Sequence, residues 1–480
     1  MLPTITVDVG TTSVKCCHFD ASGELLASDR CPTPTMKDDA GEIYDLDRLS
    51  AAVTGFIQGI EPDQRAAVRR VAITGVGESG GLVRADLSLA SPMILWHDHR
   101  GAPYLDELNA ADRASIYRTT GLPVNANYGL SKAAWAVAHV GGASDGAQWL
   151  NIAEYLAASM TGHRWSEYSL ASRTMALDLR ARTWSEEISA LVGLDVGVFP
   201  QLRTAREGVQ VSRDYAGSVG LAHDVQVHVV GHDHMVGAVG AELGRGELLN
   251  STGTTEGLLF LGDAPSVDEH SAKSKLANGI STTGAEFTLF ASIPTGGSAF
   301  ATLQSMLGIS AAELSACIVD VHERYLRGDL ELTATPLVLP QFRGSPPPTK
   351  SASARGVIAG LRSDTTTQDL VFGFFLGMAR QFTDVLELFP AYPERIKVIG
   401  PASRNVLWLQ LKADLLGTPL SVSGFPEVVS QGAQALASDR SCEWRFCDPA
   451  DVFVDAGRHA LLGEWHEQTR EQWEYLKGLP

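Results

Sequence analysis

The stretch Thr4–Asp20, TITVDVGTTSVKCCHFD, decides the fold, because it forms a complete β-hairpin with a polar turn. Thr4–Gly10 and Val14–Asp20 are rich in apolar and β-branched residues, which indicates two strands. The turn consists of Gly10, Thr11, Thr12 and Ser13. Gly10 lets the backbone approach a phosphate, the hydroxyl and amide groups that follow can bind it, and Lys15 can add a positive charge. Taken alone, the stretch is better explained as a plain hairpin with a polar turn.

A second copy of this pattern changes that interpretation. Leu248–Gly262, LLNSTGTTEGLLFLG, places a turn of Gly253, Thr254 and Thr255 between two further apolar strands. Two such hairpins about 240 residues apart indicate a duplicated domain. If the two halves face each other, both turns point into one cleft and can hold a polyphosphate from opposite sides. Asp8 would face the same space, where a carboxylate can hold Mg²⁺ through water.

Length and composition narrow the class of protein. A chain of 480 residues is long for one core, which predicts two domains and a tail. The 38 Lys and Arg residues against 56 Asp and Glu give a net charge of -18, which argues against nucleic acid or an anionic membrane as a partner. Six cysteines without paired C-x-x-C spacing favour a reducing compartment. With neither a signal-peptide pattern nor a membrane span in the sequence, we expect a cytoplasmic protein.

The candidate catalytic base is Asp233, within Val230–Gly240, VGHDHMVGAVG. Val225–Val230 alternates as a strand does and Met235–Ala241 could open a helix, so Asp233 lies on the turn between them. A carboxylate at this rim of an α/β sheet can accept a proton from a substrate hydroxyl. A helix N-cap is the simpler explanation of this segment alone. A metal site made of Asp233 and the histidines on either side is disfavoured, because residues i and i+2 diverge.

Beyond these elements, the sequence resembles a known family. The paired hairpins look like those of the sugar kinase, actin and Hsp70 superfamily of ATPases. Four more segments are similar to its FGGY carbohydrate kinase branch: Ile94–Arg100 (ILWHDHR), Thr120–Trp135 (TGLPVNANYGLSKAAW), Gly400–Gly417 (GPASRNVLWLQLKADLLG) and Ser430–Ala437 (SQGAQALA). The resemblance spans roughly residues 3–440, and the order and spacing of the motifs agree.

This resemblance implies an α/β fold of two duplicated RNase H-like domains, as in actin-like ATPases. Each domain would be a mixed sheet flanked by helices, with a cleft between the two. Residues 1–245 would form the sugar-binding side, 246–440 the nucleotide-binding side and 441–480 a helical extension. The family also implies a possible homodimer. In the tail, we expect Arg458–Leu476 to form one amphipathic helix packed on the second domain.

ATP and Mg²⁺ are the cofactors that the resemblance implies, with Asp8 and Asp233 at the metal. Gly296 falls where the family has a glycine near the nucleotide. Arg395–Gly400 reads as a strand whose turn leads into a helix with leucines every four residues. The predicted adenosine contacts of this turn are Gly400, Ser403 and Asn405, although an ordinary capped helix explains the segment about as well. Pro336–Arg355 is Pro- and Ser-rich, which predicts a long loop.

The substrate side departs from the xylulokinases of this family, which carry S-G-Q-x-H-G where this chain has Val76–Gly81 (VGESGG). Glu78 replaces the glutamine and Gly80 the histidine, which weakens D-xylulose as the substrate. Trp96 could pack a sugar's apolar face, although a buried core Trp is commoner. Asp98 and Arg100 more readily form a structural ion pair than contact substrate directly. The candidate substrate residues are Glu78, Ser79, Trp96, Asp98, Asn127, Asp233 and His234.

The predicted reaction is ATP-dependent phosphorylation of a ketose or polyol hydroxyl, with Asp233 accepting the proton. A non-catalytic, nucleotide-gated ATPase or a sugar-sensing regulator of the same fold is the alternative. A kinase for a sugar acid is a second alternative, and Glu78 counts against a carboxylate substrate.

Overall fold

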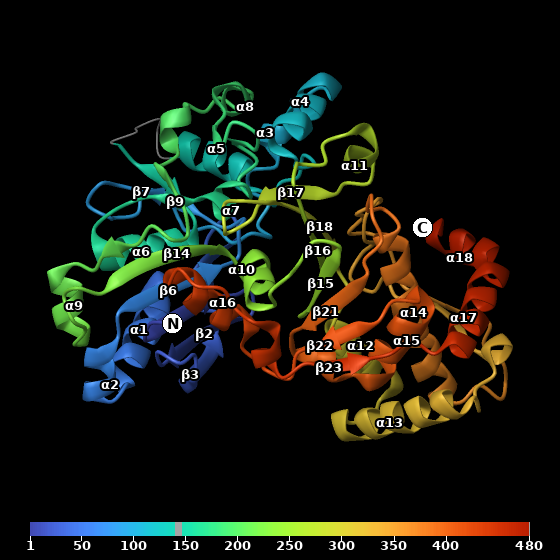
Figure 1. Cartoon of the computed structure of the whole chain (residues 1–480). Helices are drawn as coiled ribbons and strands as arrows, with labels where there is room; N and C mark the ends of the chain where they lie inside the picture. Colours follow the sequence, from blue (N-terminus) through green and yellow to red (C-terminus); the bar gives the residue numbers. More distant parts are fainter. Residues whose placement is uncertain (140–145, 480) are drawn as a thin grey trace.

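The computed structural model describes residues 1–139 and 146–479 and shows two α/β lobes side by side (Figure 1). Six strands form the sheet of the first lobe, in the order β13-β14-β6-β1-β2-β3. Their bounds are β1 Thr4–Val9, β2 Ser13–Phe19, β3 Leu25–Pro32, β6 Arg70–Gly75, β13 Val209–Gln210 and β14 Gln226–His232. Helices α1 (Leu46–Gly59) and α6 (Ile152–Thr161) bury their apolar faces in the core of this sheet.

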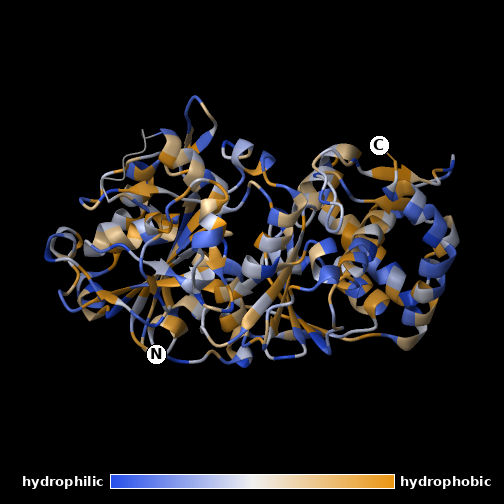
Figure 2. Cartoon of the chain, turned by 90° about the horizontal axis from the view of Figure 1, so that it is seen from above, coloured by the Kyte–Doolittle hydropathy of each residue, from blue (hydrophilic) through white to orange (hydrophobic). Residues whose placement is uncertain are grey.

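Seven strands form the sheet of the second lobe, in the order β17-β18-β16-β15-β21-β22-β23. Their bounds are β15 Glu247–Thr252, β16 Glu256–Gly262, β17 Ala277–Ile280, β18 Phe287–Ile293, β21 Arg395–Ile399, β22 Leu420–Val422 and β23 Ala450–Val452. The helices around its core are α12 Ser298–Leu307, α13 Ala311–Arg327, α14 Thr367–Leu386 and α15 Val406–Leu416. In Figure 2 the central strands are largely hydrophobic, and much of the hydrophilic colour lies on outer loops and helices.

The two sheets repeat one topology. In the first, β1 pairs with β2 antiparallel and with β6 parallel, and β6 pairs with β14 parallel. In the second, β15 pairs with β16 antiparallel and with β21 parallel, and β21 pairs with β22 parallel. Both Gly-Thr-Thr segments connect the first two strands of their sheet. The predicted duplication of mixed sheets flanked by helices is therefore confirmed.

Two helices join the lobes through the middle of the molecule. Helix α10 (Asp233–Gly240) follows β14 directly, and α16 (Val428–Ala437) packs against α10 although it comes from the second half of the chain. A Cβ at Gly432 would meet the α10 backbone at 2.3 Å, so the two helices are in close contact. Helix α16 also contacts β1 and β6, which places a helix of the second half on the first sheet. Helices α10 and α16 therefore form a closely packed junction between the two lobes (Figure 1).

The tail departs from the single helix expected over Arg458–Leu476. Two helices form instead, α17 (Ala456–Gln468) and α18 (Arg470–Lys477), with a break at Thr469. The buried Arg380 of α14 donates to Thr469 Oγ1 and to the carbonyl of His466, which a continuous helix would use for its own ladder. The break lets Trp465 and Trp473 both pack on the Arg380 guanidinium, so the tail does lie on the second lobe.

Two further segments complete the fold. Within the loop expected at Pro336–Arg355, Leu337–Leu339 forms strand β19, which pairs with β20 (Val357–Ala359), so the irregular part begins after residue 339.

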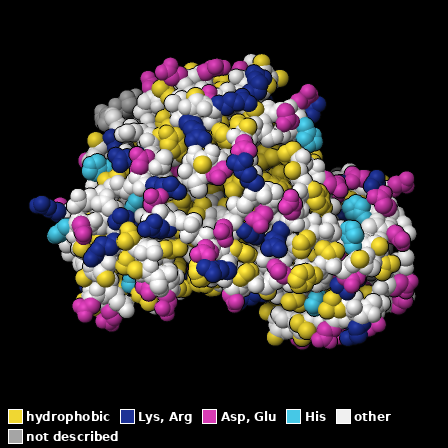
Figure 3. All heavy atoms as spheres, viewed as in Figure 1, with side chains coloured by type: hydrophobic (Ala, Val, Ile, Leu, Met, Phe, Trp, Pro, Cys, Tyr) yellow, Lys and Arg dark blue, Asp and Glu magenta, His cyan; other side chains and the backbone are white. Residues whose placement is uncertain are grey.

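In the part of the chain that the structure describes, no single helix is long and apolar enough to cross a membrane. Helices α12 and α13 together meet the length and composition for a span, but they meet at 102°. Acidic and basic side chains are interspersed over the face in Figure 3.

Candidate active site

A cavity of about 180 Å³ between the lobes brings together residues from both halves of the chain. The first half contributes Asp8 of β1, Lys15 of β2 and Asp233 of α10. The second half contributes Gly253 and Thr255 of the second Gly-Thr-Thr turn. The two hairpins, separated by most of a domain in sequence, therefore face one space, together with the candidate base.

Asp8 has the chemistry of a cation ligand. Its Oδ1 is buried and has no hydrogen-bond partner among the described residues. Burial first, and the negative charge of Asp233 second, raise the pKa of Asp8 to about 7, against the opposing effect of Lys15. A buried carboxylate that faces another carboxylate is poorly stabilised by the protein alone and fits a divalent cation. Within residues 1–139 and 146–479, no group of three or more His, Cys, Asp or Glu side chains is arranged to hold a metal ion, so a metal here would rest on two carboxylates and water.

The rest of the first hairpin lies beside the cavity. Lys15 Nζ forms an ion pair with Glu427 Oε2 at 3.1 Å. Glu427, a residue of the second half, therefore takes the position next to Lys15 where we expected a phosphate. Trp96 Nε1 donates to Thr11 Oγ1 at 3.0 Å. Thr11 and Thr12 are exposed at the tip of the turn. Within the turn, the Gly10 amide donates to the Ser13 carbonyl at 3.1 Å.

Asp233 is the first residue of α10 and not its N-cap, which is His232. Its Oδ1 accepts the backbone N–H of His234 at 2.6 Å and lies 3.2 Å from His232 Nδ1. A β-bulge at Val229/Gly231 shifts the end of β14, with Gly231 at φ +117°. Bulges of this kind re-aim the side chains that follow them, here towards the cleft.

Glu78 is held in an ion pair that the sequence did not reveal. Arg173 Nε and Nη2 donate to Glu78 Oε1 at 2.9 and 2.7 Å, and both side chains are largely buried. Burial alone would raise the pKa of Glu78, but Arg173 first and His232 second outweigh it and hold the pKa well below its ordinary value. Glu78 is therefore a permanent anion whose charge Arg173 balances.

The other substrate candidates occupy defined positions. Arg100 donates to both Asp98 oxygens at 3.0 and 2.8 Å and also pairs with Asp38, which confirms the structural ion pair. Ser79 is buried, and Asn127 Oδ1 contacts His99 Nε2. His234 Nδ1 lies 2.9 Å from Ser251 Oγ, a contact between the two halves.

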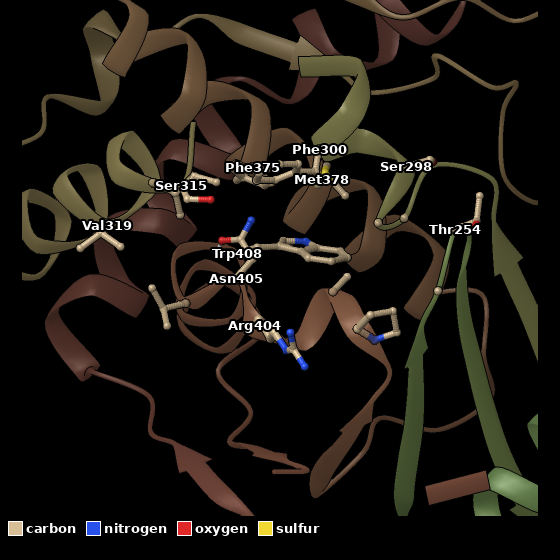
Figure 4. Close-up of a pocket in the computed structure, with 17 residues that line it drawn as sticks. Thr254, Ser298, Phe300, Ser315, Val319, Phe375, Met378, Arg404, Asn405 and Trp408 are labelled. Carbon is tan, nitrogen blue, oxygen red and sulfur yellow. Dashed lines mark hydrogen bonds between the residues drawn. The ribbon is translucent and has the colours of Figure 1, made fainter. Parts of the chain in front are cut away.

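A larger cavity of about 570 Å³ adjoins the first, since Gly253 and Pro401 line both. Figure 4 shows Phe375 and Met378 on one side of it and Trp408 and Arg404 on the other. Its remaining lining residues are Thr254, Gly296, Gly297, Ser298, Phe300, Ser315, Ile318, Val319, Ala402, Asn405 and Val406. An apolar slot with a few polar groups suits a flat heteroaromatic ring.

Close backbone contacts shape the junction between the two cavities. A Cβ at Gly296 would lie 2.4 Å from the Thr255 carbonyl carbon, and one at Gly400 would lie 2.7 Å from the Thr252 oxygen. Ser403 lines neither cavity, and its hydroxyl donates to the Gly400 carbonyl at 2.6 Å. Asn405 lines the larger cavity while its Oδ1 caps α15 through the Trp408 amide at 3.1 Å.

Sequence reasoning missed Arg173, Glu427 and the aromatic walls of the larger cavity. Arg173 follows the short helix α7 (Tyr168–Ala171) and meets Glu78 across 95 residues of chain. Glu427 meets Lys15 across 412 residues. Long-range charge pairs leave no periodic signal in a single sequence. An acidic residue such as Glu78, at the end of a predicted strand, does indicate that a basic partner lies nearby in the fold.

The fold and the site together define a two-domain α/β protein of the actin-like ATPase fold, with a cavity of about 570 Å³ beside two carboxylates. Models of the FGGY family of carbohydrate kinases match this chain over residues 4–240 for the N-terminal domain and 248–438 for the C-terminal domain. The chain belongs to this family, and it is an ATP-dependent carbohydrate kinase.

Individual relatives agree with that assignment. The chain is 25% identical to a glycerol kinase of Enterococcus casseliflavus over 98% of its own length and 95% of the relative. It is 28% identical to a glycerol kinase of Bordetella pertussis, covering 97% of this chain and 94% of the relative. The structure of a ligand-bound xylulose kinase from Lactobacillus acidophilus has the same fold, with a TM-score of 0.88 and 18% identity, covering 100% of this chain and 99% of the other.

Proposed function

We propose that this kinase transfers the γ-phosphate of ATP to a hydroxyl group of a small polyol or ketose, with Asp233 as the general base. The observation that carries the proposal is the cavity shared by Asp8, Lys15, Asp233, Gly253 and Thr255. Phosphoryl transfer depends on positioning and on stabilising negative charge, and these residues supply both. The relatives that are glycerol kinases support a small polyol among the acceptors.

The nucleotide would span the two adjoining cavities. Its adenosine would lie in the larger one, between Phe375 and Trp408, and its phosphates would follow the Gly253–Thr255 turn into the smaller one. If a phosphate of ATP displaced the Glu427 carboxylate from Lys15, the Lys15 ammonium would stabilise the negative charge of the transferring phosphoryl group. Asp8 and Asp233 would hold Mg²⁺ through water, which leaves Asp233 Oδ2 able to accept the hydroxyl proton. When bound, the ion supplies positive charge against the charge that develops on the phosphoryl oxygens.

On the acceptor side, Asp233 would take the hydroxyl proton as the oxygen attacks phosphorus. Asp233 Oδ1 is already engaged by the His234 amide, which leaves Oδ2 for the acceptor. The Glu78–Arg173 pair offers a charged but balanced wall for hydroxyl groups. Because the positive charge of Arg173 offsets the negative charge of Glu78, Glu78 would repel a carboxylate-bearing acceptor only weakly. Sugar acids therefore belong in the acceptor panel.

We also propose the domain boundaries and the cellular setting. Residues 1–245 act as the sugar side and 246–440 as the nucleotide side, and closure of the cleft excludes water that would compete with the sugar. Residues 441–480 support the second side. All six cysteines are free thiols, which supports a cytoplasmic location. The homodimer implied by the family stays a prediction that sedimentation would test.

The test is the Asp233→Asn variant in an ADP-release assay with glycerol, tetritols, pentuloses, hexuloses and sugar acids. We expect phosphorylation to fall by roughly two to four powers of ten, the usual contribution of a positioned base. Stabilisation of the protein by ADP should persist, because the adenosine cavity is untouched. Asp224→Asn, an exposed carboxylate in the loop before β14, is the matched control. Full activity of the Asp233→Asn variant would remove this residue from the mechanism.

A further inference from the structure

The residue next to the base has an unusual setting. His232 ends β14 and is 6% exposed, with its ring between two carboxylates. Its Nδ1 lies 3.2 Å from Asp233 Oδ1, and its Nε2 lies 3.8 Å from Glu78 Oε2. The ring therefore stands between the base and the buried Glu78–Arg173 pair.

Several features of the backbone are built around this ring. A Cβ at Gly77 would lie 2.3 Å from His232 Cδ2 and 2.6 Å from Arg173 Cγ, so only a glycine leaves room for both side chains. The His232 amide donates to Ser169 Oγ at 2.9 Å. The carbonyl of Gly231 accepts from Thr74 Oγ1 at 2.6 Å, which fixes the bulge that precedes the ring. The position of the imidazole is thus fixed by two other segments, residues 74–77 and the Ser169 hydroxyl of α7.

The ring nitrogen that faces the base, His232 Nδ1, is available to bond to Asp233. His232 Nδ1 is buried and has no aligned hydrogen-bond partner in the described part of the chain, and Asp233 Oδ1 is the acceptor in reach. Contacts of this kind are commonly long in a ligand-free site and tighten when the reacting groups assemble. A group that orients the base in this way is a recurring part of proton-transfer sites.

We propose that His232 is a positioning residue for the reaction, one that holds Asp233 Oδ1 through Nδ1 and thereby presents Oδ2 to the acceptor hydroxyl. The second nitrogen faces Glu78 Oε2 at 3.8 Å, too far for a hydrogen bond, so the ring lies against the Glu78–Arg173 pair without bonding to it. The inference rests on the proposed role of Asp233.

The test compares two amide replacements of His232. An Asn amide can take the place of Nδ1, and a longer Gln amide can take the place of Nε2. His232→Asn should therefore keep kcat within a few-fold of the wild type. His232→Gln should lower kcat by about tenfold to a hundredfold, the worth of one hydrogen bond to a charged group, with the acceptor KM changed less than about threefold.

The control is His228→Asn. His228 is a buried histidine of the same strand whose Nδ1 contacts the Ala205 carbonyl, and it forms no ion pair with Glu78 or Asp233. It should leave kcat unchanged. Thermal unfolding with and without ADP checks that each variant is folded.

Three results would overturn the inference. His232→Gln could keep the wild-type kcat, both amide variants could lose kcat equally, or the acceptor KM could rise while kcat holds. The last result would make His232 a binding residue and not a positioning one. If Asp233→Asn is itself fully active, the proposed function fails first and the role of His232 fails with it. If Asp233→Asn is inactive while His232→Gln is normal, only the role of His232 fails.

Discussion

Replacing Gly296 by alanine should damage catalysis without unfolding the protein. A Cβ at this position would lie 2.4 Å from the carbonyl carbon of Thr255 and 2.6 Å from its oxygen. Ordinary contact begins at 3.4 Å, so the second Gly-Thr-Thr turn must move by about 1 Å. Backbone cannot rotate out of the way as a flexible side chain can. The displaced turn is the one that would hold the phosphates of ATP opposite Asp8.

A misplacement of this size in a site that works by positioning costs on the order of a hundredfold in rate. We therefore expect kcat/KM for ATP to fall by about a hundredfold in a coupled ADP-release assay. Gly463→Ala is the matched control, because Gly463 lies in α17 with nothing within 4 Å of the added Cβ. That variant should have wild-type kinetics and equal or higher thermal stability. Wild-type kcat/KM in the Gly296→Ala variant would refute the idea that this contact sets the turn.

Two further predictions concern stability. In the absence of Mg²⁺, Asp8→Asn should stabilise the protein near pH 8 by up to roughly 4 kcal/mol and have no effect near pH 4. The pKa of Asp8 is raised from 3.8 to about 7, so between these values the folded state keeps a proton that the unfolded state has released, and stability falls as the pH rises through this window. Urea unfolding at both pH values measures the effect, and equal stabilisation at both would contradict it. Lys412→Met should cost about 3–5 kcal/mol, because it leaves the buried Glu256 without its cation. The double variant Lys412→Met/Glu256→Leu should regain most of that loss, and a double variant as unstable as the single one would show that packing, and not charge, is responsible.

The architecture was predictable because its signals are local. The hairpin at Thr4–Asp20 and its copy at Leu248–Gly262 each contain their strands and turn within a short segment. Repetition of the segment then indicated the duplication, which the matching strand orders confirm. The helix after Pro401 was predictable for the same reason, since Leu407, Leu411 and Leu415 are all buried on α15.

The predictions that failed depended on distant partners. The tail was expected to be one helix, because nothing in its own sequence marks a break at Thr469. The break arises from Arg380, a buried cation on α14 that takes the Thr469 hydroxyl and the His466 carbonyl. A buried guanidinium must find acceptors, and this need outweighs the small helix preference of one turn.

Sequence alone determined the two hairpins and the position of Asp233 between a strand and a helix, because backbone preferences are set by neighbouring residues. The class of reaction was indicated by the resemblance of several motifs to the FGGY carbohydrate kinases. Tertiary structure alone decided that Glu78 pairs with Arg173, that Glu427 forms an ion pair with Lys15, and that His232 stands between two carboxylates. Which charges meet depends on the surfaces that the closed chain brings within a few ångströms, and Coulomb energy depends on distance in space and not along the chain.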